Sequence, residues 1–349
     1  TASHNPAAYN GIKMCRAGAA PVGQDSGLAD ISAMLVEGVP EYAGPVGRIS
    51  EREMLTDYAD YLLGLVPPLG RPLRVVVDAG NGMAGLTAPV VLGKLPVTVE
   101  EMYFELDGSF PNHEANPIDP ANLVDLQAAV RAGEADLGLA FDGDADRCLA
   151  VDEDGNMING DQIMGILARA KQREGKLNHD TLVVTVMSNL GLKLALRSMG
   201  IKTVQTNVGD RYVLEEMLRG DYSLGGEQSG HVINREFATT GDGTLTALTL
   251  CNEVVKSGKS LKELAADFPQ LPQTLINVPN VDKMAAKTNA KVQAAVEREE
   301  KLLGDTGRVL LRPSGTEPLV RVMAEAETQQ QADEVCDRLA KVVADELTL

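Results

Sequence analysis

Residues 136–147 read DLGLAFDGDADR. The first six form a short apolar run of the kind that makes a buried strand, and Asp142, Asp144 and Asp146 follow it directly. Open α/β sheets bind ligands at the carboxyl ends of their strands. The stretch therefore predicts a strand that delivers three carboxylates to a binding site.

The spacing of these carboxylates permits three interpretations. They can converge on a hard divalent ion such as Mg²⁺, which prefers oxygen ligands and often binds a phosphate oxygen as well. An EF-hand loop would also have Glu153 at its twelfth position, but it needs Gly where Arg147 stands and a helix before the loop. A solvated acidic turn is the third interpretation, and the crowding of like charges makes it costly. We favour the Mg²⁺ site.

On both sides of this stretch, short apolar runs alternate with helical patterns, which is typical of βαβ units and predicts an α/β fold. With 349 residues, more than one domain is expected. Residues 267–279 contain three prolines and no helical period, so we expect a linker there. After it, two strands and a helix predict a small α+β domain.

Predicted strands cover residues 74–78, 136–141, 181–187, 203–207, 307–311 and 319–325. Predicted helices cover residues 121–131, 162–171 with Asp161 as cap, 210–219 and 329–347.

Composition limits the function. The chain has 32 basic and 50 acidic residues and a formal net charge of −18, which argues against nucleic-acid binding and requires any phosphate site to be locally basic. The sequence has no run of about 18 apolar residues, so no membrane association is expected. The four cysteines form no CxxC pair and no secretory signal precedes them, which favours reduced thiols and a cytoplasmic location.

The opening residues TASHNP carry a second motif. Ser3 is followed by His4 and, ten residues on, by Lys13, so it could be a phosphorylated nucleophile whose charge these neighbours stabilise. A plain polar turn explains the same residues equally well.

A third motif is GGEQSGH at residues 225–231. Glu227 and Ser229 can bind neighbouring sugar hydroxyls, while the glycines allow close approach of the backbone. Taken alone, an ordinary glycine-rich turn is the better explanation of this piece.

A fourth motif is RPSGTEP at residues 312–318, with Arg321 after it. Two arginines, two hydroxyls and the backbone amides around a glycine suit a phosphate monoester. A surface hairpin would explain the glycine and prolines but not the pair of arginines.

In this order, the four motifs resemble those of the α-D-phosphohexomutase superfamily, which comprises phosphoglucomutase, phosphomannomutase and phosphoglucosamine mutase. TASHNP resembles its phosphoserine loop, DGDADR its metal loop, GEQSGH its sugar-binding loop and RPSGTEP its phosphate-binding loop. The resemblance covers essentially the whole chain. It implies an isomerase that interconverts hexose 6-phosphate and hexose 1-phosphate through a phosphoserine and a hexose bisphosphate intermediate.

The resemblance also implies roles for individual residues. Ser3 would carry the phosphate, with His4, Lys13 and Arg147 beside it as catalytic residues. Mg²⁺ would be held by Ser3 together with Asp142, Asp144 and Asp146. The substrate would be bound by Arg211, Glu227, Ser229, His231, Arg312, Ser314, Gly315, Thr316 and Arg321.

The family architecture implies related α/β domains around a cleft and a small C-terminal lid domain. The expected domains are residues 1–45 with the phosphoserine loop, 46–155 with the metal loop, 156–268 with the sugar loop and 269–349 with the phosphate loop. Because the chain begins inside the phosphoserine loop, we expect most of the first domain to be missing.

The preferred sugar is less directly indicated. Residues 1–141 resemble the phosphomannomutase branch, as in YFELDGSFPNHEANP, whereas residues 142–349 resemble the phosphoglucosamine mutase branch, as in NGDQIMGILA. We favour a glucosamine phosphate as substrate, with phosphomannomutase/phosphoglucomutase activity as the alternative. A truncated, non-catalytic phosphosugar-binding protein is the alternative from another class, and the sequence indicates no oligomeric state.

Overall fold

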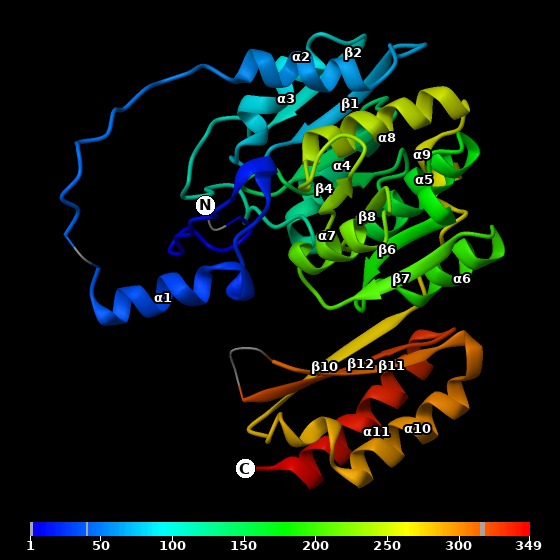
Figure 1. The fold of residues 1–349 in the computed structure, drawn as a ribbon. Coiled ribbons are helices and arrows are strands. Elements are labelled where there is room, and N and C mark those ends of the chain that lie inside the picture. Colours follow the sequence, from blue (N-terminus) through cyan, green and yellow to red (C-terminus); the bar gives the residue numbers. More distant parts are fainter. Residues whose placement is uncertain (1–2, 40, 315–317) are drawn as a thin grey trace. The chain divides into compact units, whose positions relative to one another are not determined.

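The strand predicted before the acidic loop is β3, Leu137–Phe141, the middle strand of a sheet, between the strands β1 and β4 that Figure 1 labels. The computed structural model describes residues 3–39, 41–314 and 318–349. All five residues of β3 are buried. A strand buried on both faces needs neighbouring strands and covering helices, so the surrounding elements follow from it. The predicted α/β fold class is confirmed.

The described chain divides into two units. The first runs up to Ser188 and includes Leu196–Phe268, and the second contains Asn189–Ala195 and Pro269–Leu349. Among the described residues, no helix combines the length and apolar character needed to cross a bilayer.

The sheet that contains β3 has the strand order β2-β1-β3-β4-β5. Its first three strands are parallel, and β4 and β5 are antiparallel to their neighbours. The carboxyl ends of β1 and β3 therefore lie side by side, with Asp78 paired to Ala140. The other elements of this part are α1 (Leu28–Glu37), α2 (Leu55–Leu65), β1 (Leu73–Asp78), α3 (Ala84–Leu92), β2 (Val97–Met102), α4 (Val124–Ala132), β4 (Cys148–Val151) and β5 (Met157–Ile158).

The next sheet of the first unit has the order β7-β6-β8-β9, again with one antiparallel strand at its edge. Its elements are α5 (Gly160–Arg173), β6 (Thr181–Thr185), α6 (Leu190–Ser198), β7 (Lys202–Thr206), α7 (Asp210–Arg219), β8 (Leu224–Gly226), β9 (Val232–Asn234), α8 (Gly243–Ser257) and α9 (Leu261–Ala265). The N-cap of α5 is Asn159 and not Asp161, because the side chains of Asn159 and Gln162 form a reciprocal capping box.

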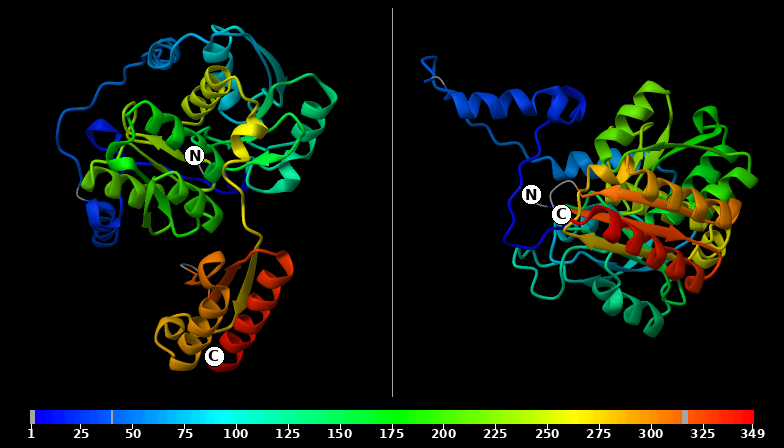
Figure 2. Two further views of the ribbon diagram at one scale, coloured as in Figure 1. Left: turned by 90° about the vertical axis from the view of Figure 1, so that its right-hand side faces the viewer. Right: turned by 90° about the horizontal axis from the view of Figure 1, so that it is seen from below.

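The second unit contains an antiparallel sheet with the order β10-β12-β11. Its elements are β10 (Gln273–Pro279), α10 (Ala290–Leu303), β11 (Arg308–Pro313), β12 (Leu319–Glu325) and α11 (Gln329–Leu347). Figure 2 shows the two helices, orange and red, on the same side of these strands. Val292, Val322 and Leu339 belong to the core between the layers, so this is the expected small α+β unit.

The predicted linker at residues 267–279 is wrong in its second half. Residues Gln273–Pro279 form β10, which pairs with β12 along its whole length. As an edge strand with a proline at its last position, β10 tolerates the missing N–H that would break a central strand.

Gly165 provides a test of the packing between α5 and Phe268. A Cβ at Gly165 would lie 2.6 Å from the buried Phe268 ring, whereas the exposed Gly64 in α2 has no described atom within 4 Å of such a Cβ. We expect Gly165→Ala to lower the free energy of unfolding by about 1–3 kcal/mol through overpacking. Gly64→Ala should leave it unchanged or raise it by up to about 1 kcal/mol through helix propensity. Urea unfolding of both variants measures the difference, and equal effects would contradict the packing.

Candidate active site

The loop at residues 142–147 is held in place from two sides by backbone hydrogen bonds. The Met83 N–H donates to the Gly143 carbonyl over 3.0 Å, and the Gly243 N–H donates to the Ala145 carbonyl over 3.0 Å. A Cβ at Gly143 would lie 2.5 Å from the Ser3 carbonyl oxygen, so only glycine fits there. The loop is thus fixed before any ligand binds.

Three carboxylates of this loop converge. Oxygen atoms of Asp142, Asp144 and Asp146 lie within 4.8 Å of one another, an arrangement that can hold a metal ion. Burial, followed by the charges of Asp146 and Asp144, raises the pKa of Asp142 to about 7. Such crowding of negative charge on oxygen donors fits a hard divalent cation.

Lys13 supplies positive charge to these carboxylates. Its Nζ lies 2.7 Å from an oxygen of Asp144 and 2.7 Å from an oxygen of Asp146. Burial alone would lower the pKa of Lys13, but its hydrogen bonds to both carboxylates raise it above its ordinary value. The side chain therefore stays charged, and a cation is already favoured at this position.

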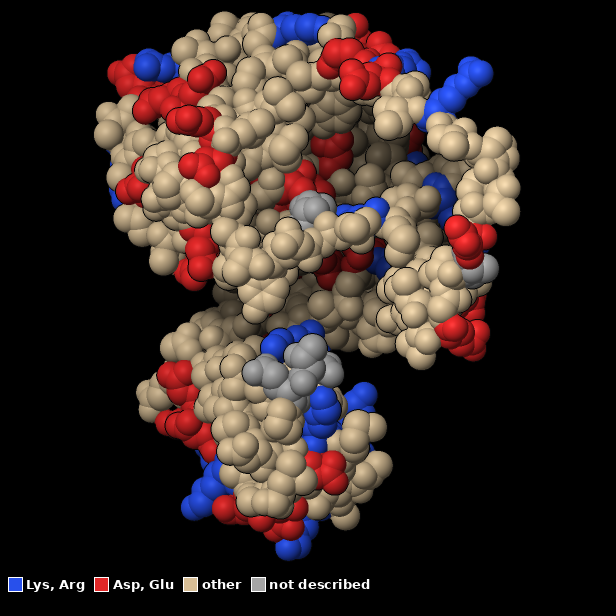
Figure 3. Space-filling view, turned by 90° about the vertical axis from the view of Figure 1, so that its left-hand side faces the viewer, with Lys and Arg blue, Asp and Glu red and all other residues tan. Residues whose placement is uncertain are grey.

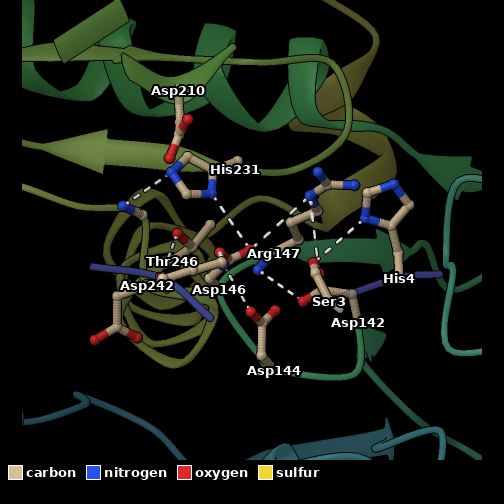
Figure 4. Close-up of polar contacts among 12 residues, drawn as sticks. Ser3, His4, Asp142, Asp144, Asp146, Arg147, Asp210, His231, Asp242 and Thr246 are labelled. Atoms are coloured by element: carbon tan, nitrogen blue, oxygen red, sulfur yellow. Dashed lines mark hydrogen bonds and ion pairs between the residues drawn. The ribbon is translucent and has the colours of Figure 1, made fainter. Parts of the chain in front are cut away.

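Ser3 lies against the same loop, as Figure 4 shows. Its Oγ donates to Asp142 Oδ2 over 2.7 Å, and His4 Nδ1 lies 3.3 Å from the same Oγ. Burial and then Arg147 lower the pKa of His4, so its ring is neutral near neutral pH. The Arg147 N–H donates to Asp142 Oδ1 over 3.1 Å. Two predicted site residues, His4 and Asp142, therefore contact the Ser3 hydroxyl directly, and the backbone N–H of Arg147 is joined to it through Asp142.

His231 lies behind Asp146 rather than in the open. The Gly241 N–H donates to His231 Nε2 over 3.1 Å, so the ring proton is on Nδ1, which lies 3.3 Å from Asp146 Oδ1 (Figure 4). Burial alone would lower the pKa of His231. The neighbouring Asp146 more than offsets this effect and raises that pKa above its ordinary value. The Gly241 N–H, however, opposes a second proton at Nε2. In turn, His231 and Lys13 hold the pKa of Asp146 well below its ordinary value against the effect of burial.

A cavity of about 330 Å³ lies beside the carboxylates, and its lining includes Lys13, Asp146, Arg211 and His231. Figure 3 shows acidic side chains within a hollow on this face of the first unit. The Arg211 guanidinium stacks on Tyr212, with 4.7 Å between its Cζ and the ring centroid. The cavity thus combines anionic and cationic groups with room for a small polar ligand.

Glu227 and Ser229, the predicted sugar contacts, differ in their surroundings. Glu227 Oε1 accepts a hydrogen bond of 2.9 Å from the Gly209 N–H and so fixes the turn before α7. Ser229 Oγ is buried and has no hydrogen-bond partner among the described residues. An orphaned buried hydroxyl suits a ligand that brings its own donor or acceptor.

In the second unit, Arg312 and Arg321 lie directly opposite each other on β11 and β12. Like charges in such a pair destabilise a sheet. Burial and then the charge of Arg321 lower the pKa of Arg312, and Arg321 Nε is buried with no hydrogen-bond partner in the described part of the chain. Lys283 Nζ donates to the Ser314 carbonyl over 2.6 Å. Gly315 and Thr316 lie outside the described residues. Arg312, Arg321 and Lys283 form a cationic cluster suited to an anion.

Sequence reasoning missed the residues that hold the acidic loop. Met83 follows the turn at residues 79–82, and Gly243 begins α8 behind its N-cap Asp242. Asp242 also accepts a hydrogen bond of 3.0 Å from the Tyr58 hydroxyl. A Gly-Asn-Gly turn after a buried strand and an Asp-Gly helix start were the available signals.

Three domain models of one family match this chain. The phosphoglucomutase/phosphomannomutase alpha/beta/alpha domain II matches residues 56–155, and domain III matches residues 159–271. The C-terminal domain of the same family matches residues 275–342. A curated relative, the phosphoglucosamine mutase of Bifidobacterium adolescentis, is 70% identical over 361 aligned residues, which cover 100% of this chain and 78% of that protein.

Solved structures give the same fold. A phosphoglucomutase/phosphomannomutase family protein from Burkholderia thailandensis superposes with a TM-score of 0.82 at 26% identity, covering 100% of this chain and 77% of that one. The N-acetylphosphoglucosamine mutase of Aspergillus fumigatus, solved with GlcNAc-6P and magnesium, gives a TM-score of 0.67 at 21% identity. That match covers 83% of this chain and 65% of the fungal one, and at this identity it concerns the fold alone.

We expect Asp144→Asn to weaken Mg²⁺ binding about tenfold or more, because even residues that only orient metal ligands are worth about 10–100-fold. The fold should persist, since the change removes a charge without changing volume. The matched control is Asp154→Asn, an aspartate that pairs with Lys262 in an exposed loop. Isothermal titration with Mg²⁺ decides, and equal dissociation constants for the two variants would remove Asp144 from the metal site.

Proposed function

The chain belongs to the phosphoglucomutase/phosphomannomutase family, and we propose that it interconverts glucosamine 6-phosphate and glucosamine 1-phosphate through a phosphoserine at Ser3 and a bisphosphate intermediate. The observation that carries this proposal is the Ser3 hydroxyl, which is hydrogen-bonded to Asp142 within the three-carboxylate loop. The curated phosphoglucosamine mutase relative matches the whole chain, residues 1–141 included, which favours glucosamine over mannose or glucose phosphate.

Each transfer would break one P–O bond and form another. The phosphoryl group passes from Ser3 Oγ to a sugar hydroxyl, and the proton of that hydroxyl ends on Ser3 Oγ. In the second half, the other phosphoryl group of the bisphosphate passes to Ser3 Oγ, and the Ser3 proton ends on the sugar oxygen that has lost the phosphoryl group. Asp142, Asp144 and Asp146 would hold Mg²⁺, which when bound neutralises charge on the transferring phosphoryl group. Their fit to a divalent cation is supported by the raised pKa of Asp142 and by the ammonium of Lys13 already beside Asp144 and Asp146.

The chain's own cationic side chains would also stabilise negative charge on the transferring phosphoryl group. Lys13 bonds Asp144 and Asp146. The Arg147 guanidinium lies 3.8 Å from Asp142 Oδ2, the oxygen that accepts from Ser3 Oγ. Both would bring positive charge to the loop that a phosphoryl group on Ser3 would face. Neutral His4 contacts Ser3 Oγ and can orient that oxygen by a hydrogen bond. Arg211, Ser229 and His231 are the candidate sugar contacts of the first unit, and Glu227 would act with them once its bond to Gly209 is shared with a hydroxyl.

The cationic cluster of the second unit is proposed to hold the phosphate that is not reacting. An anion between Arg312 and Arg321 would relieve their cross-strand repulsion and satisfy Arg321 Nε. Ser314, Gly315 and Thr316 complete this proposed phosphate site by their place in the RPSGTEP motif.

The first test compares substrates and the state of Ser3. With Mg²⁺ and a trace of glucose 1,6-bisphosphate, turnover of glucosamine 6-phosphate should exceed turnover of mannose 1-phosphate, followed by ³¹P NMR. Intact-mass measurement should find a phosphate that Ser3→Ala lacks, and this variant should lose most turnover because the proposed phosphoryl carrier is removed. Ser32→Ala, an exposed serine in α1, is the control.

The outcomes separate the candidate functions. Faster turnover of mannose or glucose phosphate would assign the chain to the other branch of the family. Binding of sugar phosphate without turnover or phosphate on Ser3 would favour the non-catalytic binding protein.

Arg321→Ala should weaken binding of glucosamine 6-phosphate by about 1.5–3 kcal/mol, the value of a hydrogen bond to a charged group. Stability should stay the same or rise, because the repulsion with Arg312 disappears. Arg298→Ala, which removes an exposed arginine of α10, is the matched control for affinity. Calorimetric titration and thermal unfolding measure the two effects, and unchanged affinity would leave the loop as a surface hairpin.

A further inference from the structure

A second histidine, His113, is bonded so that both ring nitrogens must donate. Its Nδ1 lies 2.9 Å from the Glu114 carbonyl oxygen, and its Nε2 lies 3.0 Å from Asp78 Oδ2. A carbonyl and a carboxylate are acceptors only, so the ring carries a proton on each nitrogen and a positive charge. His113 is therefore an imidazolium paired with a carboxylate that is 1% exposed.

Asp78 is the last residue of β1, and its carboxylate also organises the turn that follows. Asp78 Oδ1 accepts a hydrogen bond of 2.8 Å from the Gly80 N–H. Gly80 and Asn81 both have positive φ, so the turn needs external support to keep this shape. The Asn81 side chain provides part of it by donating to the Glu105 carbonyl and accepting from Asn112.

The far end of this turn touches the acidic loop. The Met83 N–H bonds the carbonyl of Gly143, the residue between Asp142 and Asp144. A Cβ on Gly82 would lie 2.7 Å from the Gly143 carbonyl oxygen, so the two backbones are in direct contact. Ala115, two residues after His113, packs on Gly143 as well. His113 and Asp78 thus reach the acidic loop through neighbouring chain, at the turn of residues 79–83 and at Ala115, and not by direct contact with its carboxylates.

We propose that His113 and Asp78 form a positioning pair for the acidic loop at residues 142–147. The pair is a buried imidazolium and carboxylate that fix the turn at residues 79–83 against Gly143. This role rests on the proposed metal site and adds to it residues that touch neither metal nor substrate. Breaking such a pair leaves an uncompensated buried charge beside the turn. The acidic loop would then lose the geometry that brings its carboxylates together.

The charge on His113 gives the pair a pH dependence. Asp78 above all, and also the Glu114 carbonyl, raises the pKa of His113 despite burial. Tyr103 packs edge-on against the His113 ring, with 5.3 Å between the ring centroids, and its hydroxyl donates to Asp125. The groups that face His113 are therefore anionic or neutral. The contribution of the pair is therefore complete below the ordinary histidine pKa and is lost as pH rises through the raised one.

The test measures Mn²⁺ affinity in the full chain by electron paramagnetic resonance, with thermal unfolding alongside. His113→Leu, which removes both donors, should weaken Mn²⁺ binding about 10–100-fold, as changes behind metal ligands do. His113→Gln keeps one hydrogen-bond donor for Asp78 and should therefore lose less Mn²⁺ affinity than His113→Leu. The matched control is His179→Gln, which changes an exposed histidine in the turn just before β6 and should bind Mn²⁺ like the unmodified chain.

The pH series separates positioning from bulk stability. The ratio of the dissociation constants of His113→Gln and the unmodified chain should be largest below the ordinary histidine pKa. It should fall as pH rises through the raised pKa of His113, because the advantage of the imidazolium disappears. A constant ratio, or a folded His113→Leu variant with unchanged Mn²⁺ affinity, would overturn the role. If His113→Leu does not fold, the ratio for His113→Gln still decides. No Mn²⁺ binding by the unmodified chain would remove the metal site itself, and this role with it.

Discussion

Three carboxylates on one loop of six residues repel one another, and contacts from elsewhere in the first unit hold the loop together against that repulsion. Asp142 is fully buried, so water does not screen its charge. The loop is therefore bonded at Gly143 by Met83 and at Ala145 by Gly243, and Lys13 and Arg147 bring positive charge to it. Met83, Gly243 and Lys13 come from three different stretches of chain, whereas Arg147 ends the loop itself. The acidic loop is the point on which those stretches converge.

Local patterns predicted the elements that depend on local energetics. Helices α7 and α11 begin and end at the predicted residues, because helical period and caps lie within a few residues. The strand before the acidic loop was also predicted, since a buried run of apolar residues is visible in the sequence. The prediction failed at β10, because its pairing partner β12 is distant in sequence and prolines flank the strand.

The candidate site was partly visible in the same way. The acidic residues and Ser3 stand in recognisable motifs, yet they are 139 positions apart, and only the fold shows the hydrogen bond between Ser3 and Asp142. The residues that hold the loop were not predicted. Met83 and Gly243 contribute backbone N–H groups, which every residue except proline possesses, so side-chain chemistry carries no signal of that role.

In the proposed metal site, Lys13 would make folding independent of metal binding. In small metal-dependent domains the ion supplies the folding energy, and a chelator unfolds them. Here the chain carries its own counter-ion, with an ammonium bonded to both Asp144 and Asp146. In the proposed metal site, an entering ion would displace a tethered cation and not fill an uncompensated group of carboxylates. That displacement would lower its net affinity, and we expect the chain to fold without the ion.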